Sequence, residues 1–323
     1  MPTSVGYVVA VDAGGTQTRV GCFTLDGVLL ARCVGPGGSP NHNHGAAEHV
    51  RSTIAAAMTV GALAVEDAVA LTAGVAGYEI DAANDWIDTF FEGSTLTCPR
   101  QVVNDAVVAH RGALAGAPGV IVVAGTGSMI AAITDDGTVL ESGRFQHYAG
   151  GARHLVFDVM HRILIGDHID ADAKLIKTVL TWWGARDVGD LHRIVLGLDG
   201  QDYNDVKRQY GGLAPAITAA VDDSPLADAA VTRLAEKTAV GVRLLAPLIS
   251  RSAVPVALAG ALATSAEFAD RITRLLTANS EPNITIANAA LDPLGGAALM
   301  ALESIGVAVT PELVRQLQVS TGR

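Results

Sequence analysis

Short apolar runs along this chain alternate with segments whose apolar residues recur at helical spacing. Residues 8–11 read Val-Val-Ala-Val and stop at Asp12, and residues 69–74 form a second apolar run that ends in Ala-Gly. Residues 45–64 instead carry apolar side chains on one helical face, at Ala46, Val50, Ile54, Ala57 and Met58. The first pattern is typical of buried strands and the second of an amphipathic helix. The alternation predicts an α/β protein.

One strand–turn–strand pattern occurs twice. An apolar run leads into residues 14–16, Gly-Gly-Thr, in the first copy and into residues 125–127, Gly-Thr-Gly, in the second. Each copy continues through another strand to an Asp-Gly pair, at Asp26 and Asp136, which is the common signal for a short hairpin. The copies are offset by 110 residues, as Asp26 and Asp136 illustrate. This register predicts two duplicated halves that share one nucleotide.

The rest of the chain continues the alternation of strands and helices. The first half offers strand 101–105 and helices 81–91 and 106–114. The second half offers a strand meander 119–144, helix 153–166, mostly helical residues 168–250, strands 255–260 and 283–287, and a small-residue helix that opens at 292–297. The sequence thus predicts two domains, residues 1–112 and residues 113–323, the second with a helical insertion at about 168–250.

Composition narrows the class of protein. The 323 residues are 50% hydrophobic and 17% charged, which suits soluble domains with ample cores. The net charge of −11 disfavours nucleic acid or an anionic membrane as a partner. Cys22, Cys33 and Cys98 form no Cys-x-x-Cys pair, and no apolar run reaches the roughly 18 residues of a membrane span. We therefore expect a cytoplasmic protein without a membrane or nucleic-acid partner.

The glycine-rich turns and the acid beside the first of them are candidates for chemistry. Glycine lets successive backbone N–H groups form a concave anion site, and Thr16 and Thr18 add hydroxyl donors. Asp12 ends the first strand, where it could hold a hydrated divalent cation beside such an anion. Mg²⁺ with a polyphosphate fits this pattern. The plainer alternative is a pair of tight turns.

Asn104 and Asp105 end a strand and open a helix. A carboxylate at the carboxyl end of a sheet strand is a typical catalytic position in α/β folds. The structural alternative is that Asp105 only caps the helix. We favour the catalytic role, because a predicted phosphate turn precedes this strand and another follows it.

Two polar loops, residues 35–44 and 143–154, are candidate ligand loops. The first could also be a plain surface turn. Its His-x-His spacing has no carboxylate or cysteine partner nearby, so it does not indicate a metal site. Four histidines spaced by sevens, at 147, 154, 161 and 168, would lie about 10.5 Å apart along a helix, too far for one metal.

The chain resembles the BadF/BadG/BcrA/BcrD ATPase family, which includes the N-acetylglucosamine kinases. The resemblance rests on Asp-Ala-Gly-Gly-Thr-x-Thr at 12–18, Asn-Asp-Ala at 104–106, Ala-Gly-Thr-Gly-Ser at 124–128, Ala-Gly-Ala at 259–261 and Gly-Gly-Ala at 295–297. It implies a duplicated RNase H-like, actin-like ATPase and sugar kinase fold of two domains, with ATP, Mg²⁺ and a sugar in the interdomain cleft.

The motifs and the resemblance together assign roles to individual residues. Asp105 corresponds to the catalytic base, and Asp12 and Asp105 are the expected metal ligands. The expected nucleotide-binding residues are Gly14, Gly15, Thr16, Gln17, Thr18, Gly125, Thr126, Gly127, Gly260, Ala261, Ser265 and Gly295. The expected sugar-binding residues are Asn41, Asn104, Asp105, Gln146, His147, Gly150 and Asp158.

One stretch departs from the family pattern. Members usually carry Gly-Asp-Glu-Gly-Ser after the second meander. Residues 146–154 occupy that place here and contain no acid, and the next acid along the chain is Asp158. In this respect the chain is similar to the actinobacterial glucosamine kinases, which implies a homodimeric, ATP-dependent kinase acting on the 6-hydroxyl of D-glucosamine. Asp158 or Glu79 would then hold the ammonium group, although both could be plain surface acids. The alternatives are an N-acetylglucosamine kinase and an ATPase that activates a radical dehydratase or reductase.

Overall fold

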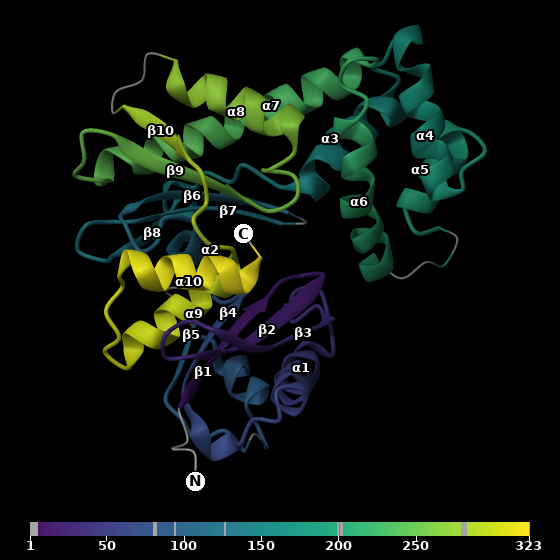
Figure 1. Cartoon of the computed structure of the whole chain (residues 1–323). Helices are drawn as coiled ribbons and strands as arrows, with labels where there is room; N and C mark the ends of the chain where they lie inside the picture. Colours follow the sequence, from purple (N-terminus) through teal and green to yellow (C-terminus); the bar gives the residue numbers. More distant parts are fainter. Residues whose placement is uncertain are drawn as a thin grey trace. The chain divides into compact units, whose positions relative to one another are not determined.

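A computed structural model describes residues 6–79, 83–93, 95–125, 127–198, 200, 203–278 and 283–322, with the backbone alone for 203–208. It contains two five-stranded sheets with the strand orders β3-β2-β1-β4-β5 and β10-β9-β6-β7-β8 (Figure 1). The strands of the first sheet are β1 Tyr7–Ala13, β2 Gln17–Thr24, β3 Leu29–Pro36, β4 Ala68–Val75 and β5 Arg100–Asn104. Those of the second are β6 Gly119–Ala124, β7 Ser128–Ile133, β8 Val139–Glu141, β9 Val254–Ala259 and β10 Ile284–Ala287. The expected α/β fold is confirmed.

The first sheet brings three strand ends to one edge. β1 runs antiparallel to β2 and parallel to β4, and β4 runs parallel to β5. Their last residues are in register, since Ala13 pairs with Val75 and Val75 with Asn104. Residues that follow these strands therefore emerge at the same edge, which is where ligands bind in open α/β sheets.

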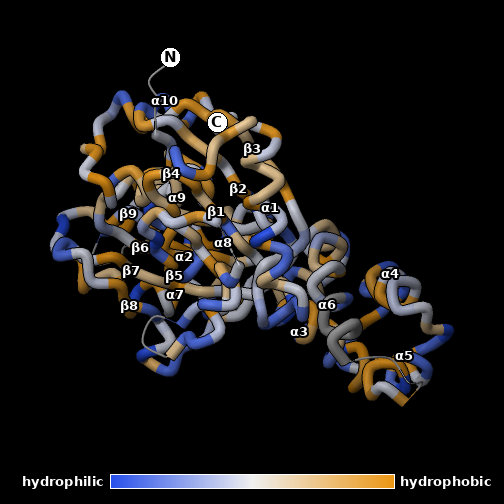
Figure 2. The backbone as a smooth tube through the Cα atoms, turned by 90° about the horizontal axis from the view of Figure 1, so that it is seen from below, coloured by the Kyte–Doolittle hydropathy of each residue, from blue (hydrophilic) through white to orange (hydrophobic). Residues whose placement is uncertain are grey.

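Alternate residues of β1 enter different cores. Val9 and Val11 pack with α1, Ala46–Val60, whereas Val8 and Ala10 pack with α9, Pro293–Ser304. A strand with both faces buried reads as a continuous apolar run, which explains the sequence of residues 8–11. In Figure 2 the hydrophobic colour lies mainly on the strands and on α9, and the hydrophilic colour in the loops.

The remaining helices are α2 Asp105–Ala113, α3 Ala152–Ile165, α4 Ala173–Trp183, α5 Val188–Val195, α6 Tyr203–Thr218, α7 Pro225–Leu245, α8 Ala266–Thr277 and α10 Pro311–Thr321. The expected helices at 45–64, 106–114 and 153–166 and the helical insertion are thus present. The predicted helix 81–91 is wrong: its described part is a short 3₁₀ helix, Asp85–Phe90, that buries Phe90. Among the described residues, no helix has the length and hydropathy needed to cross a membrane.

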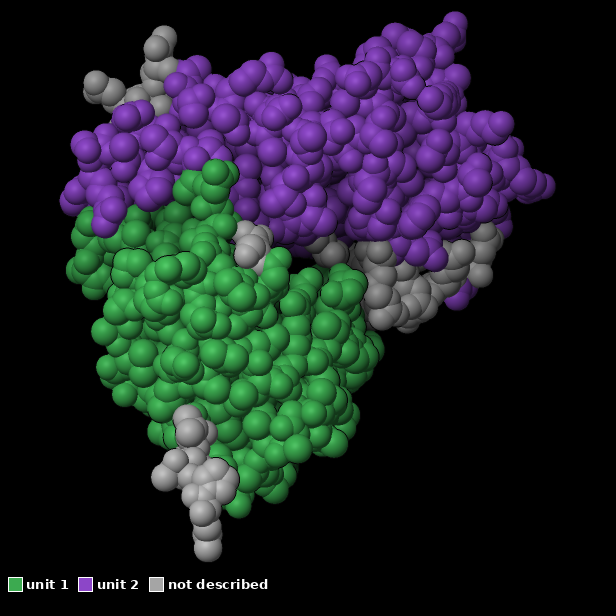
Figure 3. Space-filling view, in the orientation of Figure 1, with its two compact units in different colours: residues 1–121, 131–139, 287–323 green, residues 122–130, 140–286 purple. Residues whose placement is uncertain are grey.

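The chain divides into two compact units that differ from the expected halves (Figure 3). Unit 1 comprises residues 1–121, 131–139 and 287–323, and unit 2 comprises residues 122–130 and 140–286. The predicted boundary at 112/113 placed the last segment in the second domain. That segment instead covers the first sheet, because Leu294, Leu302 and Leu317 join the core formed by the inner side chains of β1.

Candidate active site

The first glycine turn joins β1 to β2 in unit 1. The Gly14 N–H donates to the Gln17 carbonyl at 2.9 Å, which closes the turn. Asn43 Nδ2 donates to the Gly15 carbonyl at 2.9 Å, so the 37–45 loop is hydrogen-bonded to the turn. Thr16 and Gln17 are exposed, whereas Thr18 is fully buried and its hydroxyl donates to the Pro36 carbonyl at 2.7 Å. The Thr18 hydroxyl is thus used within the hairpin, and its role toward a ligand stays a prediction.

Asp12 lies one residue before the end of β1 and is buried. Arg19, its partner across the hairpin, donates from Nη1 to Asp12 Oδ2 at 2.8 Å. Burial raises the pKa of the Asp12 carboxyl, and the Arg19 guanidinium acts in the opposite direction. Arg19 is not among the site residues expected from the sequence, although the tight turn of the hairpin places it opposite Asp12.

Asn104 and Asp105 begin α2. Asn104 is the N-cap: its Oδ1 accepts the Ala106 N–H at 2.8 Å and its Nδ2 donates to the Tyr78 carbonyl at 2.6 Å. Asp105 is thus not needed as the cap, which removes the structural alternative considered for it. Burial, followed by the negative charge of Asp12, raises the pKa of Asp105 to about 7. A carboxylate that titrates near neutrality suits a general base.

The glycine pair at the start of α9 serves capping and packing. Gly295 is buried and its N–H donates to Asp292 Oδ1 at 2.8 Å, so its own N–H is used in capping the helix, and its nucleotide-binding role stays a prediction. A Cβ on Gly296 would stand 2.0 Å from the Val108 carbonyl oxygen, and one on Gly112 would stand 2.5 Å from the Asp292 carbonyl oxygen. These glycines let α2 and α9 approach at backbone distance.

The second glycine turn, at 125–127, contacts two other glycine-bearing turns of unit 2. The Gly125 carbonyl accepts the Ala152 N–H at 2.8 Å, and the Ala124 carbonyl accepts the Leu262 N–H at 3.0 Å. A Cβ on Gly260, whose φ is +92°, would stand 2.5 Å from the Ala124 carbonyl oxygen. The turns at 125–127, 150–152 and 260–263 therefore pack backbone against backbone, and Ala261 is exposed beside them.

Gly125 and Gly127 have open space where a side chain would begin. Among the described residues beyond its chain neighbours, a Cβ on either glycine would meet no atom within 4 Å, and neither glycine is among those with a positive φ. Neither packing nor conformation therefore demands glycine at these positions, whereas close approach of a ligand to the backbone would. Thr126, the remaining residue of the predicted phosphate turn, lies outside the described residues.

The other predicted site residues are distributed over both units. Asn41 is exposed in unit 1, and its Nδ2 would stand 2.8 Å from a Cβ on Gly77. Gln146 is exposed with a left-handed backbone, φ 55°, in unit 2. The His147 imidazole lies 2.7 Å, through Nε2, from the Lys237 carbonyl oxygen. Ser265 begins α8, and its hydroxyl donates to the Leu262 carbonyl. These contacts are compatible with the predicted sugar- and nucleotide-binding roles, which stay predictions.

Asp158 has two arginine partners, Arg162 on its own helix, α3, and Arg233 on α7. Arg233 donates from Nε to Asp158 Oδ2 at 2.9 Å, and Arg162 donates from Nε to Oδ1 at 3.3 Å. The carboxylate is therefore committed to this ion-pair network. An ammonium group at Asp158 would have to share the carboxylate with both arginines, and this role stays a prediction. Gly150, at φ +96°, is buried beneath the side chain of His154.

The protein could supply part of the ligand set of a Mg²⁺ ion, through Asp12 and Asp105. Among the described residues, no group of three or more histidine, cysteine, aspartate or glutamate side chains could hold a metal ion. Mg²⁺ with a nucleotide commonly needs only one or two carboxylates, with waters and phosphates as its other ligands. Asp12 and Asp105, which influence each other electrostatically, fit that requirement.

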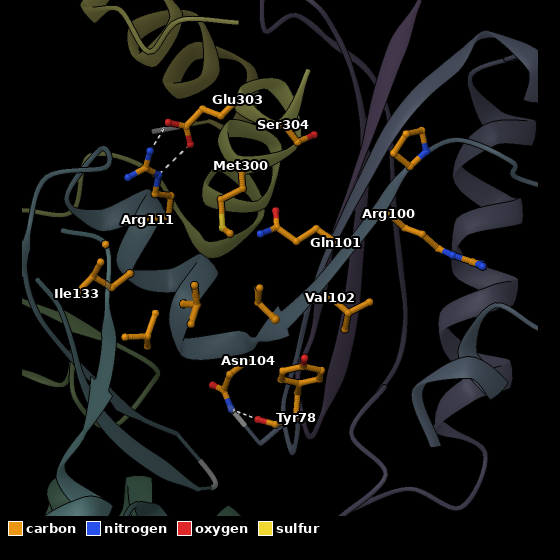
Figure 4. A pocket seen from close by; sticks show the side chains of 15 residues that line it. Tyr78, Arg100, Gln101, Val102, Asn104, Arg111, Ile133, Met300, Glu303 and Ser304 are labelled. Atoms are coloured by element: carbon orange, nitrogen blue, oxygen red, sulfur yellow. Dashed lines mark hydrogen bonds and ion pairs between the residues drawn. The ribbon is translucent and has the colours of Figure 1, made fainter. Parts of the chain in front are cut away.

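A pocket of about 730 Å³ lies along β5 and α2 in unit 1 (Figure 4). At one end Arg111 forms an ion pair with Glu303, and at the other Asn104 donates to the Tyr78 carbonyl. Among the predicted site residues in the described ranges, only Asn104 contributes to its lining. The lining of the cavity thus includes Asn104, the residue before Asp105, but none of the glycine turns.

Comparison with known proteins gives matches at the levels of sequence and fold, although no family model matches. The N-acetylmuramic acid/N-acetylglucosamine kinase of Clostridium acetobutylicum is 30% identical over 149 residues, 45% of this chain and 48% of the relative. The chain thus matches about half the length of this curated relative. A structure from Chromobacterium violaceum, assigned as an N-acetylglucosamine kinase, matches with a TM-score of 0.71 and 26% identity over 93% of this chain and 100% of that one.

A third match is a ROK family glucokinase from Streptomyces griseus in complex with glucose and AMPPNP. Its TM-score is 0.57 at 20% identity, covering 92% of this chain and 98% of the glucokinase, a likeness of fold alone. The protein therefore has the two-domain α/β fold of the sugar kinases and actin-like ATPases. The matches in sequence are to N-acetylglucosamine kinases, whereas the ROK glucokinase is similar in fold alone.

Proposed function

We propose that this protein is an ATP-dependent hexosamine kinase that phosphorylates the 6-hydroxyl of an amino sugar. The observation that carries the proposal is Asp105, a carboxylate at the start of α2 whose pKa is raised to about 7. The open backbone at Gly125 and Gly127 supports a nucleotide, and the kinase relatives support the class of reaction. Membership of the BadF/BadG family, a homodimer and a cytoplasmic location remain parts of this proposal.

The mechanism requires Asp105 to orient the sugar hydroxyl and accept its proton as the hydroxyl oxygen bonds to the γ-phosphorus of ATP, while the bond from that phosphorus to the leaving ADP breaks. Burial beside Asp12 keeps this carboxylate basic enough for the task at neutral pH. When bound, Mg²⁺ would neutralise phosphate charge, with Asp12 as its protein ligand. The backbone N–H groups at 14–16 and 125–127 would stabilise the phosphates from fixed positions.

Two sugars remain candidates. D-Glucosamine is favoured by the absence of the family's acidic stretch from residues 146–154. N-acetylglucosamine is favoured by the names of the relatives and by Asp158, whose carboxylate an ammonium group would have to share with Arg162 and Arg233. An ATPase activator is the remaining alternative; among the described residues no cysteine cluster supports it, and Cys22 is buried.

The test is a coupled assay of ADP release with Mg-ATP and one sugar at a time. Glucosamine, N-acetylglucosamine, mannosamine, glucose and a sample without sugar form the panel. Turnover with either amino sugar but not with glucose supports the proposal and selects the substrate. ADP release that does not depend on sugar would favour the ATPase activator, and no release under any condition would overturn the kinase assignment.

A further inference from the structure

The outer edge of β5 borders the 730 Å³ cavity of unit 1. β5 is the last strand of the first sheet and, in the part of the chain that the structure describes, it pairs only with β4. The Leu71 N–H of β4 donates to the Pro99 carbonyl, which fixes the pattern of the ladder. Because the backbone groups of successive strand residues point to opposite sides, Gln101 and Val103 pair with β4, and Val102 turns its N–H and C=O to the free edge.

The cavity follows this edge and gives it walls. Residues 99–104 all contribute to the lining, and α2 and α9 add Val107 and Met300 (Figure 4). Every lining residue belongs to unit 1, so the arrangement does not depend on how the units are placed. The volume lies within the range of about 300–1,000 Å³ that is typical of ligand sites. An edge enclosed in this way admits a single extended segment more readily than the equally enclosed β5 edge of a second copy.

The charges of the lining are already compensated or point elsewhere. As far as the structure describes the lining, its charged residues are Arg100, Arg111 and Glu303. Arg111 and Glu303 form an ion pair, with Nε donating to Oε2 at 2.9 Å. The Arg100 guanidinium lies over the Phe91 ring, 4.9 Å from its centroid, and points away from the cavity (Figure 4). A charged occupant would lose hydration without gaining an ion pair, which favours an uncharged one.

The polar groups that face the cavity match those of a peptide. Val102 offers one backbone donor and one backbone acceptor at the edge, and the exposed Gln101 side chain, which reaches toward Met300, offers the same pair in its amide (Figure 4). A peptide group carries the complementary acceptor and donor. Proteins usually shield a strand edge with charge, proline or a covering segment. At β5 the edge instead opens into a cavity.

We propose that the β5 edge binds an extended, uncharged segment of a partner protein, which adds a strand to the first sheet. Main-chain hydrogen bonds to Val102 would provide affinity, and alternate side chains of the segment would pack on Val103 and Met300. The inference is independent of the proposed kinase function, because it uses neither the glycine turns nor Asp105.

The experiment measures binding of a model segment by fluorescence anisotropy. The segment has five alternating valine and threonine residues, blocked ends and an uncharged methoxycoumarin label. Two matched peptides carry N-methyl groups on either the odd or the even residues, which removes the N–H groups along one edge of the added strand. One of the two should bind about tenfold or more weakly than the parent, and the other should stay within about threefold. Equal affinities of all three peptides, or no binding of the parent at about 1 mM, would overturn the proposal.

Variants of the protein test the other side of the contact. Val102→Pro removes the outward N–H, which an edge strand tolerates, and should weaken binding of the parent peptide by about tenfold or more. Gln101→Glu places an unpaired charge in the cavity and should also weaken binding, by about fivefold or more. The control is Ser52→Glu, which adds the same charge at an exposed position of α1 and should leave the affinity unchanged.

Circular dichroism and thermal unfolding establish that each variant is folded. If Val102→Pro does not fold, the comparison of Gln101→Glu with Ser52→Glu decides. Unchanged affinity in folded Val102→Pro, or equal affinities of the two glutamate variants, would overturn the proposal. Sedimentation velocity covers the other occupant: a wild-type dimer that Val102→Pro separates into monomers would assign the edge to a second copy of this chain and would also overturn it.

Discussion

Arg19 and Asp12 face each other across the first hairpin, with Nη1 2.8 Å from Oδ2. The pair compensates a buried carboxylate whose charge, in turn, raises the pKa of Asp105. Arg19 thereby connects the phosphate turn to the proposed base. The Arg19 side chain is 39% exposed, while the Asp12 side chain is only 8% exposed.

Replacing Arg19 by methionine is expected to lower the free energy of unfolding by about 1–3 kcal/mol, since it leaves the Asp12 carboxylate buried without its partner. Adding Asp12→Asn to the same chain should recover part of that loss, because the uncompensated charge is then gone. Urea denaturation of both single variants and the double variant measures the coupling. Strictly additive effects would contradict a significant interaction between the two side chains.

Asp105→Asn is expected to reduce kcat by about 10²- to 10⁴-fold, the usual contribution of a general base. ADP affinity should stay within about twofold, because the glycine turns are untouched. Steady-state kinetics and calorimetry provide the two numbers. Asp136→Asn, at an exposed hairpin, is the matched control and should leave both unchanged. Near-normal turnover of Asp105→Asn would exclude this residue as the base.

The raised pKa of Asp105 predicts two opposite pH dependences. Activity needs the ionised form, so kcat/KM should rise with pH and level off above about 7. Stability should move the other way: the folded pKa exceeds the ordinary value of 3.8, so the folded state binds the proton more tightly. The free energy of unfolding should therefore fall between about pH 4 and 7.

Asp105→Asn removes the titrating group and should flatten that part of the stability profile. Chemical denaturation at a series of pH values, for the wild type and the variant, measures the difference. Parallel profiles for the two proteins would mean that Asp105 titrates at its ordinary pKa, and a kcat/KM that is constant from pH 5 to 8 would lead to the same conclusion.

Gly125→Ala should separate stability from binding. Among the described residues beyond its chain neighbours, the added methyl group meets no atom within 4 Å, so the unfolding temperature should change by less than about 2 °C. The methyl group nevertheless fills space that a phosphate would use, and ADP affinity should fall by about tenfold or more. Differential scanning calorimetry and ADP titration test this. A stable variant with normal ADP affinity would show that the open space at the turn is not a phosphate site.

Gly296→Ala, at the crossing of α2 and α9, should lower the stability of the protein. Its Cβ would stand 2.0 Å from the Val108 carbonyl oxygen, so the helices must separate, at a cost of about 1–3 kcal/mol or more. Gly295→Ala is the comparison, since its Cβ would stand 3.0 Å from the Leu291 side chain. Denaturation midpoints should rank the first variant clearly below the second. Equal midpoints would contradict the close crossing.

Local patterns predicted much of this structure. The repeated strand–turn–strand pattern, the Asp-Gly hairpins and the helix that opens at Asp105 depend on neighbours within about 20 residues, and each is present. Long-range contacts were not predicted by these patterns. The pairing of Asp158 with Arg233 could not be predicted from neighbouring residues, because Arg233 is 75 residues away. The packing of Gly296 against α2 was not predicted either, because that helix is distant in sequence.

The return of the chain from β10 to unit 1 bears on how the protein is made. The inner face of the first sheet is covered by Leu294, Leu302 and Leu317, which are synthesised long after β1 and β4. While unit 2 emerges from the ribosome, α2 can cover part of that face through Val108, but α9 and α10 are not yet made, so Val8 and Ala10 lack the rest of their native neighbours. Translation order thus makes the earliest strand among the last to reach its native environment.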